Sequence, residues 1–181
     1  NKESNEVILL KLYNLIQIIL KHLSQPLATD ITSQFEAFYK FVKYGISRND
    51  EQITNAAIDG FIELITNSST QLLQKLSELF KEIITEIQQS EIGFFRPTFN
   101  FTDSTKKRLY ICIMPSLVDK LGDRISVKEM ITLLKFVNYI LADDYMIEEA
   151  VQTAIKLLPS AHQKNIGFSQ FGGNLYYKLL E

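Results

Sequence analysis

The amino-acid sequence predicts an all-α protein in which antiparallel helical hairpins stack as a short α-solenoid. The segment KFVKY at residues 40–44 recurs as KFVNY at residues 135–139, and each copy precedes a short break, an Asp and a second apolar helix. Only 7 Gly and 4 Pro interrupt the chain, and apolar residues recur every three or four positions along most of it. A repeated helical hairpin is typical of stacked helical repeats. The alternative is an irregular helical bundle, because every amphipathic hairpin needs similar residues.

The first predicted helix covers residues 7–23, which are dense in Leu and Ile. A polar stripe containing Lys11 and Lys21 runs along it and argues against a transmembrane segment. A helix with one narrow polar stripe is expected to be largely buried. A linker with Pro26 follows, and the next helix extends to Ile46.

Asp50 is predicted to cap a helix over residues 51–66, since its carboxylate can accept hydrogen bonds from the free amides of the first turn. A break at residues 67–69 separates this helix from another that runs to about residue 89. Residues 91–103 contain four Phe and Pro97, which predict an extended loop without strand pairing.

Helix is predicted again over residues 104–121, with a kink or break near Met114 caused by the following proline. After a turn at 122–124, Ser126 and Glu129 form a capping box for a helix over 127–142. Asp144 should cap the last long helix, residues 146–158, which Pro159 is expected to stop. Residues 161–173 are expected to be irregular, and a short helix ends the chain.

Composition restricts the classes of partner and compartment. A net charge of -2 gives no global field for nucleic acid or anionic membranes, and the short basic cluster at 106–108 is typical of a solvated helix face. The single cysteine, Cys112, cannot form an internal disulfide, which suits an intracellular location, cytoplasmic or nuclear. One repeat domain is predicted over residues 1–181, and the start at Asn1 also fits an excised piece of a longer protein. The oligomeric state stays open.

No residue pattern predicts catalysis. Phosphate loops, metal-binding Cys and His spacings and nucleophile motifs are absent from the sequence, so neither an enzyme nor a cofactor or metal is expected. The acidic residues Asp143, Asp144, Glu148 and Glu149 are better explained as caps at a helix start than as calcium ligands. An enzyme of unknown class, built around Cys112 or a histidine, is an alternative without a visible partner group.

The two hairpins at residues 30–66 and 126–158 carry matched residues. The pairs are Asp50 and Asp144, Ile53 and Ile147, Ala56 and Ala150, Gly60 and Ala154, and Leu64 and Leu158. This pattern resembles the HEAT/armadillo class of α-helical repeats, although the usual Arg of the second helix is absent.

The resemblance implies a scaffold or adaptor that binds another protein or a peptide, without catalysis and without nucleic acid. The irregular spacing is more similar to nuclear transport receptors, which implies the alternative of a fragment that binds a small GTPase or cargo.

The best candidate for protein binding is the aromatic loop, with residues Phe94, Phe95, Arg96, Phe99 and Phe101. Aromatic residues and Arg dominate the binding energy of protein interfaces. In the alternative interpretation the phenylalanines fold back and cover an open end of the core, because exposed Phe would form a patch that monomers avoid. Residues 167–173, with two Phe and three Gly, form a second candidate with the same alternative.

Overall fold

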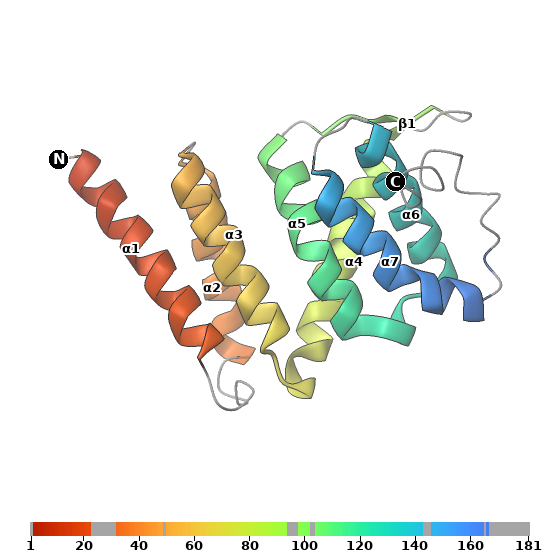
Figure 1. The fold of residues 1–181 in the computed structure, drawn as a ribbon, viewed down its shortest axis with the longest axis horizontal. Helices are drawn as coiled ribbons and strands as arrows, with labels where there is room; N and C mark the ends of the chain where they lie inside the picture. The colour runs from red at the N-terminus through yellow and green to blue at the C-terminus, as the bar shows by residue number, and fades with distance from the viewer. Residues whose placement is uncertain are drawn as a thin grey trace. The chain divides into compact units, whose positions relative to one another are not determined.

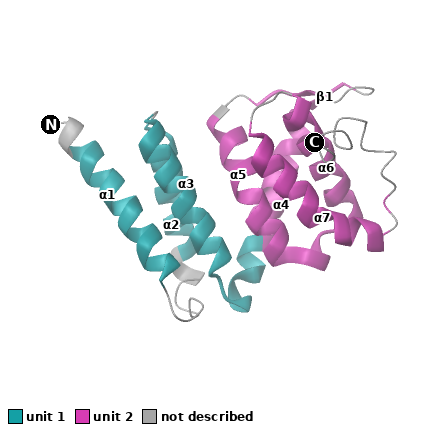
Figure 2. Ribbon diagram, viewed as in Figure 1, with its two compact units in different colours: residues 1–76 teal, residues 77–181 magenta. Residues whose placement is uncertain are grey.

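The computed structural model describes residues 2–22, 32–48, 50–93, 98–101, 104–142, 146–164 and 166. Seven α-helices account for most of these residues, which confirms the all-α class (Figure 1). The chain forms two compact units, Asn1–Leu76 and Ser77–Glu181, and the boundary falls inside a helix (Figure 2). The organisation of residues 1–181 as one domain stays a prediction.

The first unit is built on three helices, α1 (Lys2–Lys21), α2 (Thr32–Ile46) and α3 (Glu51–Thr66). Both α1 and α2 pack against α3. Phe61 of α3 is fully buried, and its ring lies 5.9 Å from that of Phe35 and 5.3 Å from that of Tyr39. The aromatic positions of α2 therefore form the predicted apolar contact with α3.

Tyr13 joins α1 to α2. Its buried ring stacks on Phe41 with the centroids 4.4 Å apart, and its hydroxyl donates a hydrogen bond to the Phe41 carbonyl oxygen. A Cβ atom added to Gly45 would lie 2.5 Å from the Tyr13 hydroxyl oxygen. The absence of a side chain at Gly45 lets the phenol ring rest on the backbone of α2.

The N-terminus of α3 is capped as predicted. The Ile53 N–H donates to Oδ1 of Asp50 at 2.9 Å, and Asp50 itself has extended backbone angles. This bond satisfies one of the amide groups that a helix start leaves without a partner. After α3 comes a short 3-10 turn, η2 (Thr70–Leu72), and then α4 (Leu73–Ser90).

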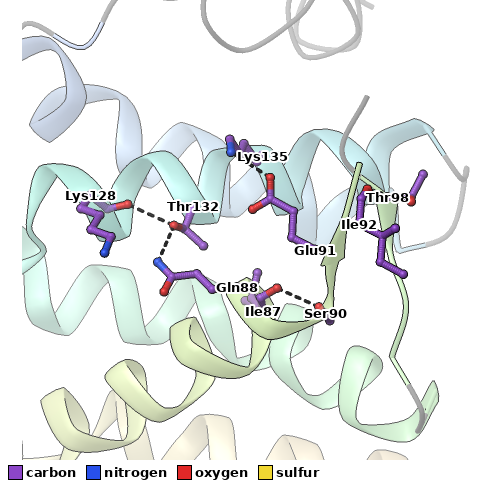
Figure 3. Close-up of polar contacts among 9 residues, drawn as sticks. All are labelled: Ile87, Gln88, Ser90, Glu91, Ile92, Thr98, Lys128, Thr132 and Lys135. Carbon is purple, nitrogen blue, oxygen red and sulfur yellow. Dashed lines mark hydrogen bonds and ion pairs between the residues drawn. The ribbon is translucent and has the colours of Figure 1, made fainter. Parts of the chain in front are cut away.

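The second unit contains α5 (Ser104–Leu121), the 3-10 turn η3 (Gly122–Arg124), α6 (Val127–Ala142) and α7 (Ile147–Gln163). Helix α7 packs against both α5 and α6. The C-terminal part of α4 also contacts α6, where Gln88 Nε2 donates to Thr132 Oγ1 at 3.0 Å (Figure 3). The predicted capping box is confirmed, because the Ser126 N–H donates to Glu129 Oε2 at 2.8 Å and the Glu129 N–H donates to Ser126 Oγ at 3.3 Å.

A short antiparallel hairpin, β1 (Glu91–Ile92) with β2 (Thr98–Phe99), stands where only a loop was predicted. The expectation that no strands pair is therefore wrong. Contacts with α6 hold both strands: Lys135 Nζ donates to Glu91 Oε1 at 2.8 Å, and the Phe99 ring packs on Phe136 (Figure 3 shows the first of these contacts). Local sequence does not reveal these contacts, because their partners lie far along the chain.

A helix break near Met114 and a helix end at Pro159 were predicted, and both are wrong, while a kink at Pro115 stays a prediction. Helix α5 continues through Pro115, and α7 continues through Pro159 to Gln163. A proline inside a helix costs about 3 kcal/mol, so other interactions must outweigh it. Pro115 is buried between the fully buried Met114 and Leu117, whose packing stabilises the helix on both sides. Pro159 is exposed, where water can satisfy the carbonyl group that loses its helical partner.

The two copies of the repeated hairpin match at their centres and differ at their ends. Ala56 and Gly60 of α3 are buried, as are Ala150 and Ala154 of α7. The nearest atom to a Cβ added at Gly60 is the Tyr13 carbonyl oxygen of α1, at 3.9 Å. This small residue therefore faces α1.

Tyr44 and Tyr139, the last residues of the repeated segment, have different environments. Tyr139 is half-buried with its ring 5.2 Å from that of Phe99, whereas Tyr44 is 51% exposed. The last residue of the repeated segment is thus packed against a ring in the second copy and exposed in the first. The Arg48 guanidinium lies 5.6 Å from the centroid of the Tyr44 ring.

Met146 occupies the N-cap position of α7. Its φ of 58° lies in the left-handed region, and its side chain makes no capping bond. The sequence predicted an Asp144 cap instead, and Asp144 lies outside the described residues. The N-cap residues of the two helices therefore differ, with Asp50 in α3 and Met146 in α7.

Candidate protein-binding surfaces

The aromatic loop is described only at its ends. Phe94, Phe95 and Arg96 lie outside the described residues, as do residues 167–173 of the second candidate segment. Phe99 and Phe101 are described, and the structure brings both against α6. The Phe99 ring meets the Phe136 ring edge-on at 5.5 Å, and the Phe101 ring lies 5.6 Å from the same ring.

Phe99 is a core residue of the second unit. Its exposed fraction is 4%, so a partner could not touch its ring without a rearrangement of the loop. Phe101 is half-buried and also lies edge-on to Tyr110 of α5, at 6.3 Å. For these two residues the geometry is that of the alternative interpretation, in which phenylalanines cover the core. Binding by the aromatic loop stays a prediction.

Helix α1 has two apolar faces, and only one of them is covered. Leu9, Tyr13 and Leu20 are buried, and the Tyr13 ring packs on Phe41 of α2. The expectation of a largely buried helix is wrong, because large apolar residues on other sides of α1 remain exposed. They are Val7, Ile8, Leu12, Leu15, Ile18 and Ile19.

Four of these residues form one continuous row, which we call the α1 stripe: Ile8, Leu12, Leu15 and Ile19. Their exposed fractions are 55%, 44%, 53% and 52%. The spacing alternates between four and three residues, so the side chains lie along one line of the helix. Isolated exposed apolar residues are ordinary on protein surfaces, but a continuous row indicates an interaction surface.

The chemistry-bearing residues are dispersed. Among the described residues no three His, Cys, Asp or Glu side chains gather as a metal site would require. Cys112 is partly buried in α5, and His162 is exposed in the last turn of α7. Glu148 accepts a bond from Gln152 on its own helix at 3.3 Å, while Asp143 and Asp144 lie outside the described residues.

The basic cluster at 106–108 is engaged within its own unit. Lys106 Nζ lies 3.0 Å from Glu86 Oε2, and the Tyr110 hydroxyl donates to the same carboxylate oxygen at 2.6 Å. Lys107 Nζ lies over the Tyr139 ring, 4.8 Å from its centroid. These contacts neutralise part of the only basic run that could have attracted nucleic acid.

Two side chains of the first unit have shifted acidity. Burial raises the pKa of the Tyr13 hydroxyl from 10.0 to about 12, because the charged phenolate would lose its hydration. Partial burial also raises the pKa of Asp59, and the negative charge of Glu63 one turn further along α3 adds to this effect. Burial is the larger cause of both shifts, and no metal-binding cluster is found among the described residues.

Comparison with protein-family models, with curated protein sequences and with solved structures finds no match. No helix among the described residues is both long enough and apolar enough to cross a membrane.

Sequence reasoning missed the α1 stripe. It treated the polar positions of this helix as a narrow stripe on a buried element. The signal was nevertheless present: apolar residues occupy two separate faces of the helix, and one of them repeats with the four-three spacing of a helix–helix seam. Sequence alone could not tell which of the two faces the protein itself would cover.

Proposed function

We propose that this chain is a protein-interaction scaffold or adaptor, built on HEAT-like helical hairpins and without a catalytic role. The observation that carries the proposal is the α1 stripe. Four large apolar side chains, each about half exposed, form a row on the surface of a helix that also packs against α3. A protein partner that covers such a row gains roughly 25 cal/mol for each Å² of apolar surface removed from water.

The helical hairpins support the proposal that the chain is a HEAT-like repeat protein. Helices α2 and α3 pack together in the first unit, and α6 and α7 pack together in the second. Each hairpin buries small residues at the middle of its second helix, namely Ala56 and Gly60 in one and Ala150 and Ala154 in the other. Stacked hairpins of this kind characteristically expose helix faces that bind proteins. We include in the proposal that the hairpins of the two units stack as a short solenoid.

A site-specific photo-crosslinking experiment tests the function. A photoreactive amino acid replaces Lys11, which is exposed on α1, and crosslinked proteins are identified after irradiation in cells that express the chain. We expect specific protein adducts that disappear when Leu12→Asp places a charge in the α1 stripe. The matched control is Ile155→Asp on α7, because Ile155 has a similar exposed fraction of 52% and lies outside the α1 stripe.

Adducts that persist in the Leu12→Asp variant, or an absence of specific adducts, would refute the assignment of the α1 stripe as a binding surface. The same experiment with the photoreactive group at Phe95 tests the aromatic loop independently. Crosslinks from that position alone would move the proposed surface to the loop. The narrower hypothesis of a transport-receptor fragment predicts a small GTPase or cargo among the adducts.

A further inference from the structure

We infer that the α1 stripe binds a second copy of this chain, with the two α1 helices packed antiparallel about a two-fold axis. This inference rests on the proposed function, because it names the partner of the same surface. Three properties of α1 carry it: the spacing of the stripe, its symmetry and the polar residues at its two ends.

The spacing of the stripe is that of a coiled-coil seam. Ile8, Leu12, Leu15 and Ile19 follow each other at intervals of four, three and four residues. This alternation averages 3.5 residues and keeps a row of side chains facing a partner helix along its whole length. A helix with such a row on its free side is shaped to pack against another helix rather than against a loop or a sheet.

The stripe is also symmetric in sequence. Its order from either end is Ile, Leu, Leu, Ile. In an antiparallel pair each Ile8 therefore lies opposite the Ile19 of the other copy, and each Leu12 lies opposite the other Leu15. A two-fold interface must be complementary to itself, so that each contact occurs twice. The α1 stripe meets this condition without any change of side chain.

Polar residues at both ends favour the antiparallel arrangement. The next seam positions beyond the stripe are Asn5 and His22, and both are exposed. An antiparallel pair places Asn5 opposite the His22 of the other copy, where amide and imidazole can form a hydrogen bond. A parallel pair would instead bring the two His22 side chains together and would align the two helix dipoles unfavourably.

Engineered cysteines test both the contact and its direction. In the antiparallel pair, Ile8 lies beside the Ile19 of the other copy, whereas the two Ile8 residues are separated by about 16 Å along the helix axis. A disulfide requires Cα atoms within roughly 7 Å. We expect a disulfide-linked dimer when Ile8→Cys and Ile19→Cys chains are mixed and oxidised, and little dimer from either variant alone. The unmodified chain, which contains Cys112, is the control.

Sedimentation equilibrium of the purified full chain measures the self-association. We expect a concentration-dependent dimer whose dissociation constant rises at least about tenfold in Leu12→Asp, as for the loss of one central interface residue, and is unchanged in Ile155→Asp. Circular dichroism of both variants checks that the helices remain.

A chain that stays monomeric at all concentrations, without the mixed disulfide, would overturn the inference. Disulfide formation by Ile8→Cys alone would also overturn it, since that result indicates a parallel pair. The proposed function fails separately. If the chain is monomeric but photo-crosslinks from position 11 reach other proteins and depend on Leu12, the interaction surface stands and only its occupant changes. If neither self-association nor such adducts are found, both proposals are refuted.

Discussion

The contact between Tyr13 and Gly45 gives the sharpest test of the first unit. A Cβ atom at residue 45 would lie 2.5, 2.7 and 2.9 Å from three atoms of the Tyr13 phenol group. Ordinary contacts between such atoms are 3.5–4.0 Å, so the ring would have to move by about 1 Å. Tyr13 cannot move freely, because it is fully buried, stacked on Phe41 and hydrogen-bonded to the Phe41 carbonyl group.

We therefore expect Gly45→Ala to destabilise the protein by about 2 kcal/mol. Overpacking typically costs about 1–3 kcal/mol, and a weakened Tyr13 hydrogen bond adds about 0.5–1.5 kcal/mol. The higher helix propensity of Ala offsets at most about 1 kcal/mol of this cost. Gly60→Ala is the matched control, because its added Cβ would be 3.9 Å from the nearest atom, the Tyr13 carbonyl oxygen. That variant should be as stable as the unchanged protein or more stable by up to about 1 kcal/mol.

Urea unfolding followed by far-ultraviolet circular dichroism measures both changes. Because the chain has two compact units, hydrogen exchange of α1 and α2 should be compared with that of α5 to assign the effect to the first unit. Gly45→Ala should cost less in a Tyr13→Leu background, since the clash then lacks its partner. A Gly45→Ala variant as stable as Gly60→Ala would refute the described packing of Tyr13 on α2.

Three further predictions concern a cap, a strained residue and a titrating group. Asp50→Ala should lower the free energy of unfolding by about 1 kcal/mol, and Asp50→Ser should largely retain it, because Ser also accepts the Ile53 amide bond; equal urea midpoints for the two variants would contradict the cap. Met146→Asn should raise the melting temperature by about 2–4 °C, since Asn tolerates a φ of 58° and can cap α7; an unchanged or lower melting temperature would argue against strain at this residue. The pKa of Tyr13 is raised from 10.0 to about 12, so the unfolded chain loses this proton first and stability should fall as the pH rises from about 10 to about 12. Near pH 11 the loss should be roughly 1 kcal/mol. The urea midpoint of Tyr13→Phe should not show this loss of stability at alkaline pH. An identical pH dependence of the two proteins would refute the prediction.

Much of the helical framework could be predicted because its signals are local. Asp50 caps α3 through an amide three residues away, and Ser126 and Glu129 close a capping box over the same distance. The repeated small residues of the two hairpins are buried where the helical period places them. Such interactions depend only on residues within one or two turns, so they can be derived from the sequence.

The strand pair and the continuation of α5 through Pro115 could not be predicted, because tertiary packing decides them. Glu91 and Phe99 form a hairpin through contacts with Lys135 and Phe136 of α6. Pro115 remains inside α5 because the neighbouring buried side chains stabilise that helix against the lost backbone bond. In each case tertiary packing stabilises the observed structure by more free energy than the local sequence preference costs.

The sequence by itself determined the all-α class, the capped helix starts and the absence of a recognisable catalytic motif. Only the tertiary structure decided which apolar faces are used inside the protein. Helix α1 carries two apolar rows, and the one that contains Leu9, Tyr13 and Leu20 is buried. The other row, from Ile8 to Ile19, stays exposed. A helical period shows that a face is apolar, but whether that face forms the core or binds a partner depends on where the remaining helices pack.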